Sequence, residues 1–273
     1  EFDRITDERT KRFIAEFFKT LSNYRSPLKF IICGVSNSSS DLIGAHGSMH
    51  RNLKPIRIPY MPPDELRKIM NAGLAELSLS FSPDLKESVV WLSCGLPYFT
   101  HLLCEELAAY AITNNRRSLD LSDLKHVTAS AIANIADGID TEYRLATSYT
   151  PTPDMVFGGS QVPSTPSQIR RYVVHAVALT GANDDDLDAV ASVARNLISI
   201  TGAWMPREYS YLDSSQVESI LEEVSAIHPY IGVSGSRARF ANPFHRAFAL
   251  LKAISEYENV PAEELLRLGM PQC

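Results

Sequence analysis

The stretch KFIICGV, residues 29–35, decides the fold class expected for the first part of the chain. It is short and continuously apolar, it follows Pro27, and the polar run Ser36–Ser40 comes directly after it. Such a run is typical of a parallel strand that is covered on both faces. A second strand is expected over residues 56–59, and an amphipathic helix over residues 6–23 precedes both. Alternating helices and short apolar strands predict an α/β sheet.

The pattern becomes helical after residue 60, and no further strand is expected until the hairpin near the C-terminus. Pro62-Pro63-Asp64-Glu65 is a typical helix start, with proline and acidic residues in the first turn. The expected helices cover residues 64–77, 84–93, 97–114 and 122–137. They predict a compact helical unit, and the stretch 147–166, rich in Pro, Gly, Ser and Thr, predicts a linker.

The last part of the chain has the element order of a winged-helix domain, a variant of the helix-turn-helix. The expected elements are helices over residues 168–180, 184–199 and 214–227, a hairpin over 231–240, and a helix over 244–257. Asp184-Asp185-Asp186 and Asp188 lack the glycine and the final glutamate of a calcium loop, and acidic residues at a helix start explain them better. No metal site is expected.

The composition is that of an ordinary globular protein, and it narrows the class of partner. The 273 residues carry a formal net charge of −6, which argues against broad electrostatic binding to nucleic acid. No apolar run approaches the roughly 18 residues of a membrane span, so no membrane contact is expected. The four cysteines form no C-x-x-C pair. We therefore expect idle thiols in the reducing cytoplasm.

The first residues resemble the end of a known motif. Glu1-Phe2-Asp3-Arg4-Ile5 is similar to the end of Walker B in AAA+ ATPases of the origin-recognition and helicase-loader branch. The resemblance implies that Glu1 polarises the attacking water, while an aspartate just before it helps to hold magnesium. Glu1-Phe2 also matches the pair of residues that a cloning site leaves, so the order of the later motifs carries the resemblance.

Two later positions fit catalytic motifs of this family. Ser36 and Asn37 follow the strand expected over residues 29–35 and resemble sensor 1, which contacts the γ-phosphate or the attacking water. Arg51 stands where the family carries the arginine finger, which reaches the nucleotide of a neighbouring subunit. The alternatives are a plain serine-rich turn for the first and a surface arginine for the second.

Gly95-Leu96-Pro97 begins the helix expected over residues 97–114. It resembles the Gly-x-Pro motif of signal-transduction ATPases with numerous domains (STAND), whose proline packs near the adenine, so Pro97 is the implied base contact. Many AAA+ proteins place the sensor 2 arginine three residues after this glycine, where this chain has Tyr98. The alternative is an ordinary helix start with proline in its first turn.

Together the motifs make the chain similar to the C-terminal part of a AAA+ ATPase. The implied fold, mostly α, is an α/β remnant of the AAA+ core (1–60), a helical lid (61–146), a linker (147–166) and a winged-helix domain (167–273). The family uses ATP and Mg²⁺ and acts as an oligomer of identical subunits. No Gly-Lys pair of a phosphate-binding loop occurs in the sequence, so we expect that loop upstream and no hydrolysis or cofactor binding by this chain alone.

Two other functions remain open. The chain is also compatible with a non-catalytic, STAND-like regulatory module that docks protein partners, a function that the absence of a sensor 2 arginine favours. The second alternative is a winged-helix protein that binds DNA through Arg237 and Arg239 of the hairpin. Arginines on an exposed hairpin are also often only a solvated face.

Overall fold

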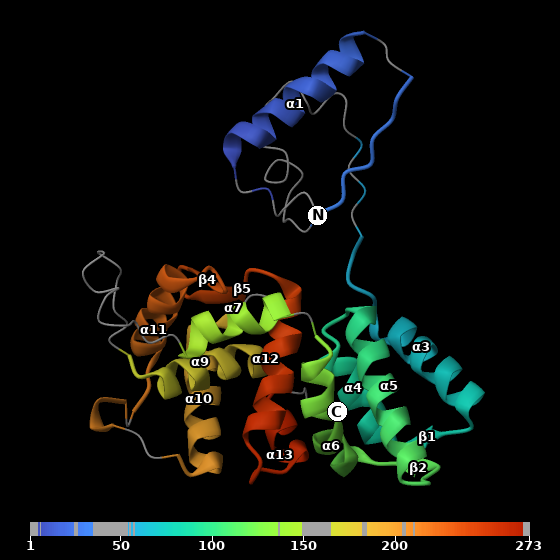
Figure 1. The fold of residues 1–273 in the computed structure, drawn as a ribbon. Helices are drawn as coiled ribbons and strands as arrows, with labels where there is room; N and C mark the ends of the chain where they lie inside the picture. The colour runs from blue at the N-terminus through green and yellow to red at the C-terminus, as the bar shows by residue number, and fades with distance from the viewer. Residues whose placement is uncertain are drawn as a thin grey trace. The chain divides into compact units, whose positions relative to one another are not determined.

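The structure, a computed structural model, describes residues 5, 7–24, 27–34, 54, 56, 58–135, 137–148, 165–181, 185–203, 206–209 and 211–269. These residues are mostly helical and form few strands (Figure 1). The chain divides into two compact units, Glu1–Pro59 and Tyr60–Cys273. The segments expected to form the lid and the winged helix both lie in the second unit.

In the first unit the described residues form one helix, α1 (Glu8–Asn23). The carboxylate of Asp7 caps its start and accepts a hydrogen bond from the backbone N–H of Thr10 at 2.9 Å. The helix predicted over residues 6–23 is thus confirmed, with its first turn beginning at Glu8.

The strands predicted over residues 29–35 and 56–59 do not occur in the described parts of these ranges. Ile31 and Ile58 are 92% and 91% exposed, so their side chains pack against no described neighbour. A strand needs a neighbouring strand for its N–H and C=O groups, and the described residues of the first unit offer none. The α/β expectation is therefore wrong for the described residues of this unit.

The second unit begins with a helical segment, the name used below for residues 61–135. Its α-helices are α3 (Pro63–Leu77), α4 (Pro83–Leu92), α5 (Pro97–Thr113) and α6 (Leu124–Ala133). Proline opens α3, α4 and α5, where its fixed φ suits the helix and its missing N–H costs no bond. These three predicted helices are confirmed. The helix predicted over residues 122–137 is shorter, because a 3-10 turn over Leu121–Asp123 precedes α6.

Two short strands in this segment were not predicted. Strand β1 (Ser80–Phe81) pairs in parallel with β2 (Ser118–Leu119), and the side chains of Phe81 and Leu119 are buried. Each strand has two residues, which is too short for an alternating pattern to reveal it. Their pairing is a product of the helices that bring the two loops together.

The tail, the name used below for residues 165–269, contains the elements expected from the sequence. Its helices are α9 (Ser167–Thr180), α10 (Leu187–Thr201), α11 (Ser214–Ile227), α12 (Pro243–Glu256) and α13 (Ala262–Arg267), with a 3-10 turn, η4 (Arg207–Tyr209). Its strands are β3 (Asp185–Asp186), β4 (Ile231–Ser234) and β5 (Arg237–Phe240), in the antiparallel order β3-β5-β4. The predicted hairpin and the helices that flank it are confirmed. Helix α13 and strand β3 were not predicted.

Helix α7 (Asp137–Ser148) falls in the range predicted for the lid, yet it packs on α9, α11 and α12 of the tail. Its buried Tyr143 and Ala146 explain this position, because they face the tail core. The chain therefore passes from the helical segment to the tail before the predicted linker begins.

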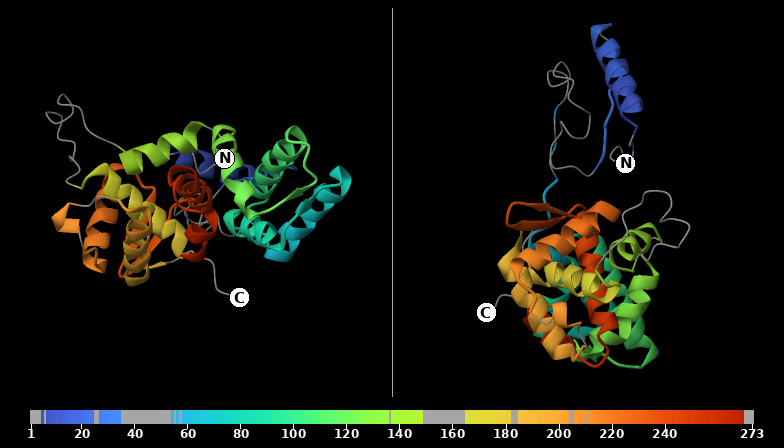
Figure 2. Two further views of the ribbon diagram at one scale, coloured as in Figure 1. Left: turned by 90° about the horizontal axis from the view of Figure 1, so that it is seen from below. Right: turned by 90° about the vertical axis from the view of Figure 1, so that its left-hand side faces the viewer.

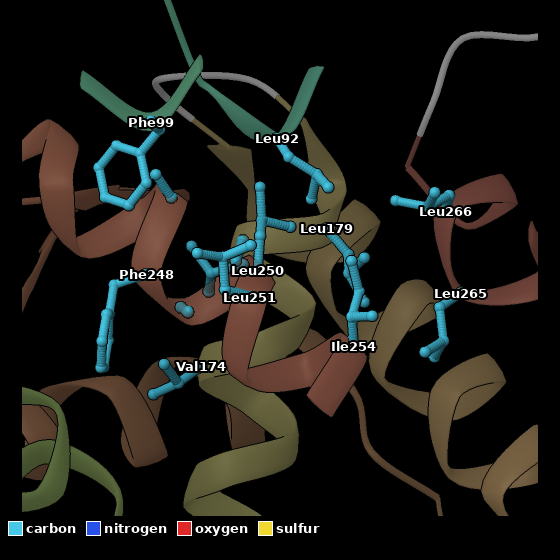
Figure 3. Packing of buried hydrophobic residues seen from close by; sticks show 14 of the residues in the cluster. Leu92, Phe99, Val174, Leu179, Phe248, Leu250, Leu251, Ile254, Leu265 and Leu266 are labelled. Atoms are coloured by element: carbon cyan, nitrogen blue, oxygen red, sulfur yellow. The ribbon is translucent and has the colours of Figure 1, made fainter. Parts of the chain in front are cut away.

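One hydrophobic cluster runs through the helical segment and the tail. The left view of Figure 2 shows α12 in red between the helical segment, in green and cyan, and the other tail helices, in yellow and orange. Leu92 and Phe99 of the helical segment lie in the same cluster as Leu179, Phe248 and Leu251 of the tail (Figure 3). The two parts share a core and are not separate globules.

Candidate functional site

The structure describes four of the predicted site residues and leaves four outside. Glu1, Ser36, Asn37 and Arg51 lie outside the described residues. Pro97, Tyr98, Arg237 and Arg239 are described, and all four lie in the second unit. The candidate site that the structure allows to be built is therefore the turn before α5 and the tail surface beside it.

The turn that leads into α5 has two consecutive residues in the left-handed region, Cys94 with φ 50° and Gly95 with φ 75°. The backbone N–H of Leu96 then bonds the C=O of Ser93 at 2.8 Å and closes the turn. The buried hydroxyl of Ser93 accepts a hydrogen bond from Thr100 at 2.8 Å, which ties the turn to the first turn of α5. Two left-handed residues in succession fold the chain back on itself and leave Pro97 at the first position of the helix.

Tyr60 and Met61 lie directly against this turn. The N–H of Met61 donates to the C=O of Gly95 at 2.9 Å. A Cβ atom added to Gly95 would lie 2.7 Å from the Cβ of Tyr60, closer than carbon atoms approach in proteins. Position 95 therefore needs glycine for its positive φ and for the close approach of the chain that enters the second unit.

An aromatic cluster covers the start of α5. The ring of Tyr98, which is 43% exposed, lies 5.3 Å from that of Phe99 and 5.7 Å from that of Phe244 at the start of α12. Phe99 is buried and also contacts Phe244, at 5.5 Å between centroids. Tyr60, which packs against the same turn, is 47% exposed, so two partly exposed tyrosines flank Pro97 in this region. Exposed aromatic side chains are residues on which a flat heteroaromatic group can stack.

The turn carries the thiol of Cys94 and lies against the phenol of Tyr60. Two arginines of the tail act on the pKa values of these groups. Burial, with a smaller effect of Cys94, raises the pKa of Tyr60, whereas Arg239 and Arg246 oppose the rise. Burial likewise raises the pKa of the Cys94 thiol to about 11, against the effect of Arg246. Cys94 is therefore a thiol at neutral pH and no nucleophile.

The two arginines differ in what they can still bind. Arg246 is buried, its Nε donates to the C=O of Ala178 at 3.2 Å, and its guanidinium lies 5.9 Å from the ring centre of Trp91. Arg239 is exposed on the outer face of β5, as is Arg237, and the buried Ala238 stands between them. Arg246 is committed to packing, and Arg237 and Arg239 are on the surface.

A buried polar network under α7 was missed at the level of sequence. His175 is fully buried between two phenol groups, with Nε2 2.7 Å from the hydroxyl of Tyr143 and Nδ1 2.7 Å from that of Tyr257. Tyr143 donates to Glu256 at 3.2 Å, so the imidazole carries its proton on Nε2 and Tyr257 donates to Nδ1. Three residues from α7, α9 and α12, together with Tyr257 just after the end of α12, thus form one directed chain of hydrogen bonds.

This network stabilises the fold. Burial, helped by Arg171 and Lys252, lowers the pKa of His175 from 6.5 to about 3, so the ring is neutral in the folded protein. Burial raises the pKa of Glu256, and the charge of Arg171 opposes that rise most strongly. A signal in the sequence did exist, since a histidine within the apolar run of α9 needs polar partners when buried.

The described residues contain no group of three or more His, Cys, Asp or Glu side chains placed to hold a metal ion. Within the same residues, no helix combines the length and the apolar character that crossing a membrane requires. No protein-family model, curated protein or solved structure matches this chain.

Proposed function

We propose that this chain is the part of a AAA+ ATPase that follows Walker B, intermediate between the origin-recognition and STAND branches. In this proposal the helical segment is the lid and the tail is a winged-helix domain. The three tail helices α9, α10 and α11 and the sheet order β3-β5-β4 support the second assignment. The activity would be nucleotide-switched assembly or remodelling of other macromolecules.

The observation that carries the proposal is the turn at Gly95. The turn has a left-handed glycine, the chain at Tyr60 packs against it, and proline opens α5 directly after it. In this proposal the turn would form the edge of the site for the base. Pro97 and Tyr98 would contact the adenine in this proposal. The partial exposure of Tyr98 and Tyr60 beside Pro97 supports this contact.

The phosphate and magnesium side of the site stays a proposal from sequence. Glu1 would polarise the attacking water, Ser36 and Asn37 would act as sensor 1, and Arg51 would reach the nucleotide of a neighbouring copy. ATP and Mg²⁺ would be held together with the phosphate-binding loop expected upstream. This chain by itself would neither bind nor hydrolyse ATP.

A non-catalytic, STAND-like regulatory module is the second candidate. Tyr98 stands where an arginine would complete the phosphate site, and the structure places an aromatic cluster around it. The helical segment and the tail share one core, which suits a switch that moves as a unit. Among the described tail residues, Tyr211 is the large hydrophobic side chain that is strongly exposed, so any docked protein would meet a polar surface.

The base contact is tested by titrating Mg-ATP into the protein that carries the upstream loop. We expect Tyr98→Ala to weaken binding about 10-fold, since a stacked base is worth about 1–3 kcal/mol. Tyr211→Ala removes a tyrosine of the tail that is even more exposed, 72% against 43% for Tyr98, and should leave the affinity unchanged. Calorimetry on this chain alone should show no heat.

If Tyr98→Ala and Tyr211→Ala bind Mg-ATP as the parent does, Tyr98 is no base contact and the site is elsewhere. If the protein with its upstream loop shows no heat with Mg-ATP, the ATPase proposal itself fails.

A further inference from the structure

Helix α12 is buried on nearly all sides, which is unusual for a helix that carries charged residues. From His245 to Ile254, every side chain except that of Lys252 is buried. A helix that is enclosed in this way packs between two bodies and not on the outside of one. Here the two bodies are the helical segment and the rest of the tail (Figure 2).

The helical segment holds the start of α12 through two side chains. Phe244 contacts the rings of Tyr98 and Phe99, at 5.7 and 5.5 Å. Two residues further on, Arg246 places its guanidinium 5.9 Å from the ring centre of Trp91 in α4 and donates to the backbone of α9. The guanidinium therefore bridges the helical segment and the tail at a site from which water is largely excluded.

The helical segment holds the end of α12 through a lysine. Lys125 of α6 donates from Nζ to the backbone C=O groups of Tyr257 and Glu258, at 2.8 and 3.0 Å, and also to that of Val260. An ammonium has three N–H donors, and here three carbonyl oxygens accept them. The cation also lies at the negative end of the helix dipole, which favours it there.

These two attachments fix the direction of α12 against the helical segment. The helix has 14 residues, so its ends are about 20 Å apart. A rotation of the tail about either end would break the contact at the other and would expose Leu92 and Phe99, which lie in the shared core (Figure 3). Both attachments therefore oppose a rotation of the tail against the helical segment.

We propose that the helical segment and the tail form one rigid lever, in which α12 carries a change at Tyr98 to the hairpin β4–β5. The transmitted signal rests on the proposed function, because it assumes that a nucleotide contacts Tyr98. The rigidity does not depend on it. Phe244 is the positioning residue, since it touches Tyr98 directly and stands four residues after the end of β5.

The rigidity is tested on this chain by hydrogen exchange at increasing denaturant. We expect peptides from α5 and from α12 to open together, with the same denaturant dependence, as one cooperative unit. In the double variant Phe244→Ala, Lys125→Met, the two sets of peptides should separate, and those at the start and end of α12 should exchange at least ~10-fold faster than those in the middle of α5.

Matched control variants distinguish coupling from general destabilisation. Phe240→Ala removes a phenylalanine whose ring contacts Tyr230 within the tail, and Lys86→Met removes a lysine that bonds Asn71 within the helical segment. Both should lower stability without separating the two sets of peptides. The lever is refuted if α5 and α12 open independently in the parent chain, or if the controls separate them as the double variant does.

The transmitted signal is tested by hydrogen exchange on the protein that carries the upstream loop, measured with and without Mg-ATP. Slower exchange in the hairpin β4–β5, together with α5 and α12, supports transmission, and Phe244→Ala should keep the effect on α5 while losing that on the hairpin. Slower exchange confined to α5 in the parent refutes transmission and leaves the nucleotide site in place. If Mg-ATP changes exchange in no part of the protein, the proposed function and the signal at Tyr98 are both refuted. The rigidity is then decided by the exchange of the nucleotide-free chain.

Discussion

At the scale of single residues, backbone conformation and burial make some side chains costly to replace. Arg170 is a buried guanidinium that donates to the C=O of Thr165 at 3.0 Å and pairs with Glu223 at 3.3 Å. It ties the chain entering α9 to α11. Gly95 is limited in another way, because its φ of 75° and its neighbour Tyr60 both exclude a side chain.

We expect Gly95→Ala to destabilise the second unit by about 1–3 kcal/mol. The new Cβ would require a left-handed alanine and would lie 2.7 Å from the Cβ of Tyr60. Chemical denaturation followed by circular dichroism measures the change. The matched control is Gly73→Ala inside α3, where nothing lies within 4 Å of the added Cβ and stability should rise by about 0.5–1 kcal/mol.

An unchanged midpoint for Gly95→Ala would mean that Tyr60 and Met61 move away from the turn at no cost. The packing of these residues across Gly95 would then be no basis for a preformed site.

At the scale of elements, α7, α9 and α12 are joined by hydrogen bonds between buried side chains. The chain of bonds from Tyr257 through His175 and Tyr143 to Glu256 fixes the rotation of each helix relative to the others. A second contact joins α7 to α12, where Nε2 of His245 lies 2.5 Å from the carboxylate of Glu142. These polar bonds select one packing arrangement for a helix with few buried apolar residues.

The pKa of His175 makes stability depend on pH in a defined direction. The folded pKa of about 3 is below the unfolded value near 6.5, so the unfolded chain takes up a proton that the folded chain does not. This stability is present above pH 6.5 and is lost as the pH falls toward 3. Glu256, with its raised pKa, has the opposite effect.

We therefore expect His175→Gln to flatten the loss of unfolding free energy between pH 6 and pH 4 by about 1.4 kcal/mol per pH unit, the effect of one proton. Urea titrations at a series of pH values measure the slope. Replacing His126, which stacks on Tyr110 in the helical segment, by Gln serves as the control for loss of a histidine. Equal slopes for the parent and His175→Gln would show that His175 is protonated in the folded state.

At the scale of the whole molecule, charge bears on the DNA alternative. The formal net charge is −6, and α11, which would enter the major groove in a DNA-binding winged helix, carries Glu218, Glu222 and Glu223 and no basic residue. Arg237 and Arg239 on the hairpin are the basic side chains next to it in sequence. Within α11 and the hairpin, the described residues thus offer DNA two arginines beside an acidic helix.

We expect duplex DNA to bind this chain only at low salt and weakly. Two phosphate contacts predict a slope of about −2 for the logarithm of the affinity against that of the salt concentration. Arg237→Ala combined with Arg239→Ala should abolish the signal in a fluorescence-anisotropy titration, whereas Arg207→Ala in the same tail should not. Binding that survives the double substitution would place the DNA contact elsewhere, and no binding at low salt would remove this function.

The sequence predicted the second unit better than the first. Helices such as α11 carry their own start signal, since Asp213 accepts from the N–H of Gln216 at 2.8 Å in a capping box. Strands do not, and the apolar run over residues 29–35 was assigned to a sheet for which the described residues supply no partner. A strand is a property of two segments, whereas a capped helix is largely a property of one.

In the candidate site, too, some features follow from the local sequence and others only from the tertiary structure. The sequence by itself determined the Gly-Leu-Pro turn, the helix it opens and the exposed arginines of the hairpin, because each follows from local backbone preference or from period-two alternation. Only the tertiary structure decided that Tyr60 packs on Gly95, that Phe244 lies on Tyr98, and that Lys125 holds the end of α12. These contacts join residues far apart in the chain, and burial in one shared core brings them together.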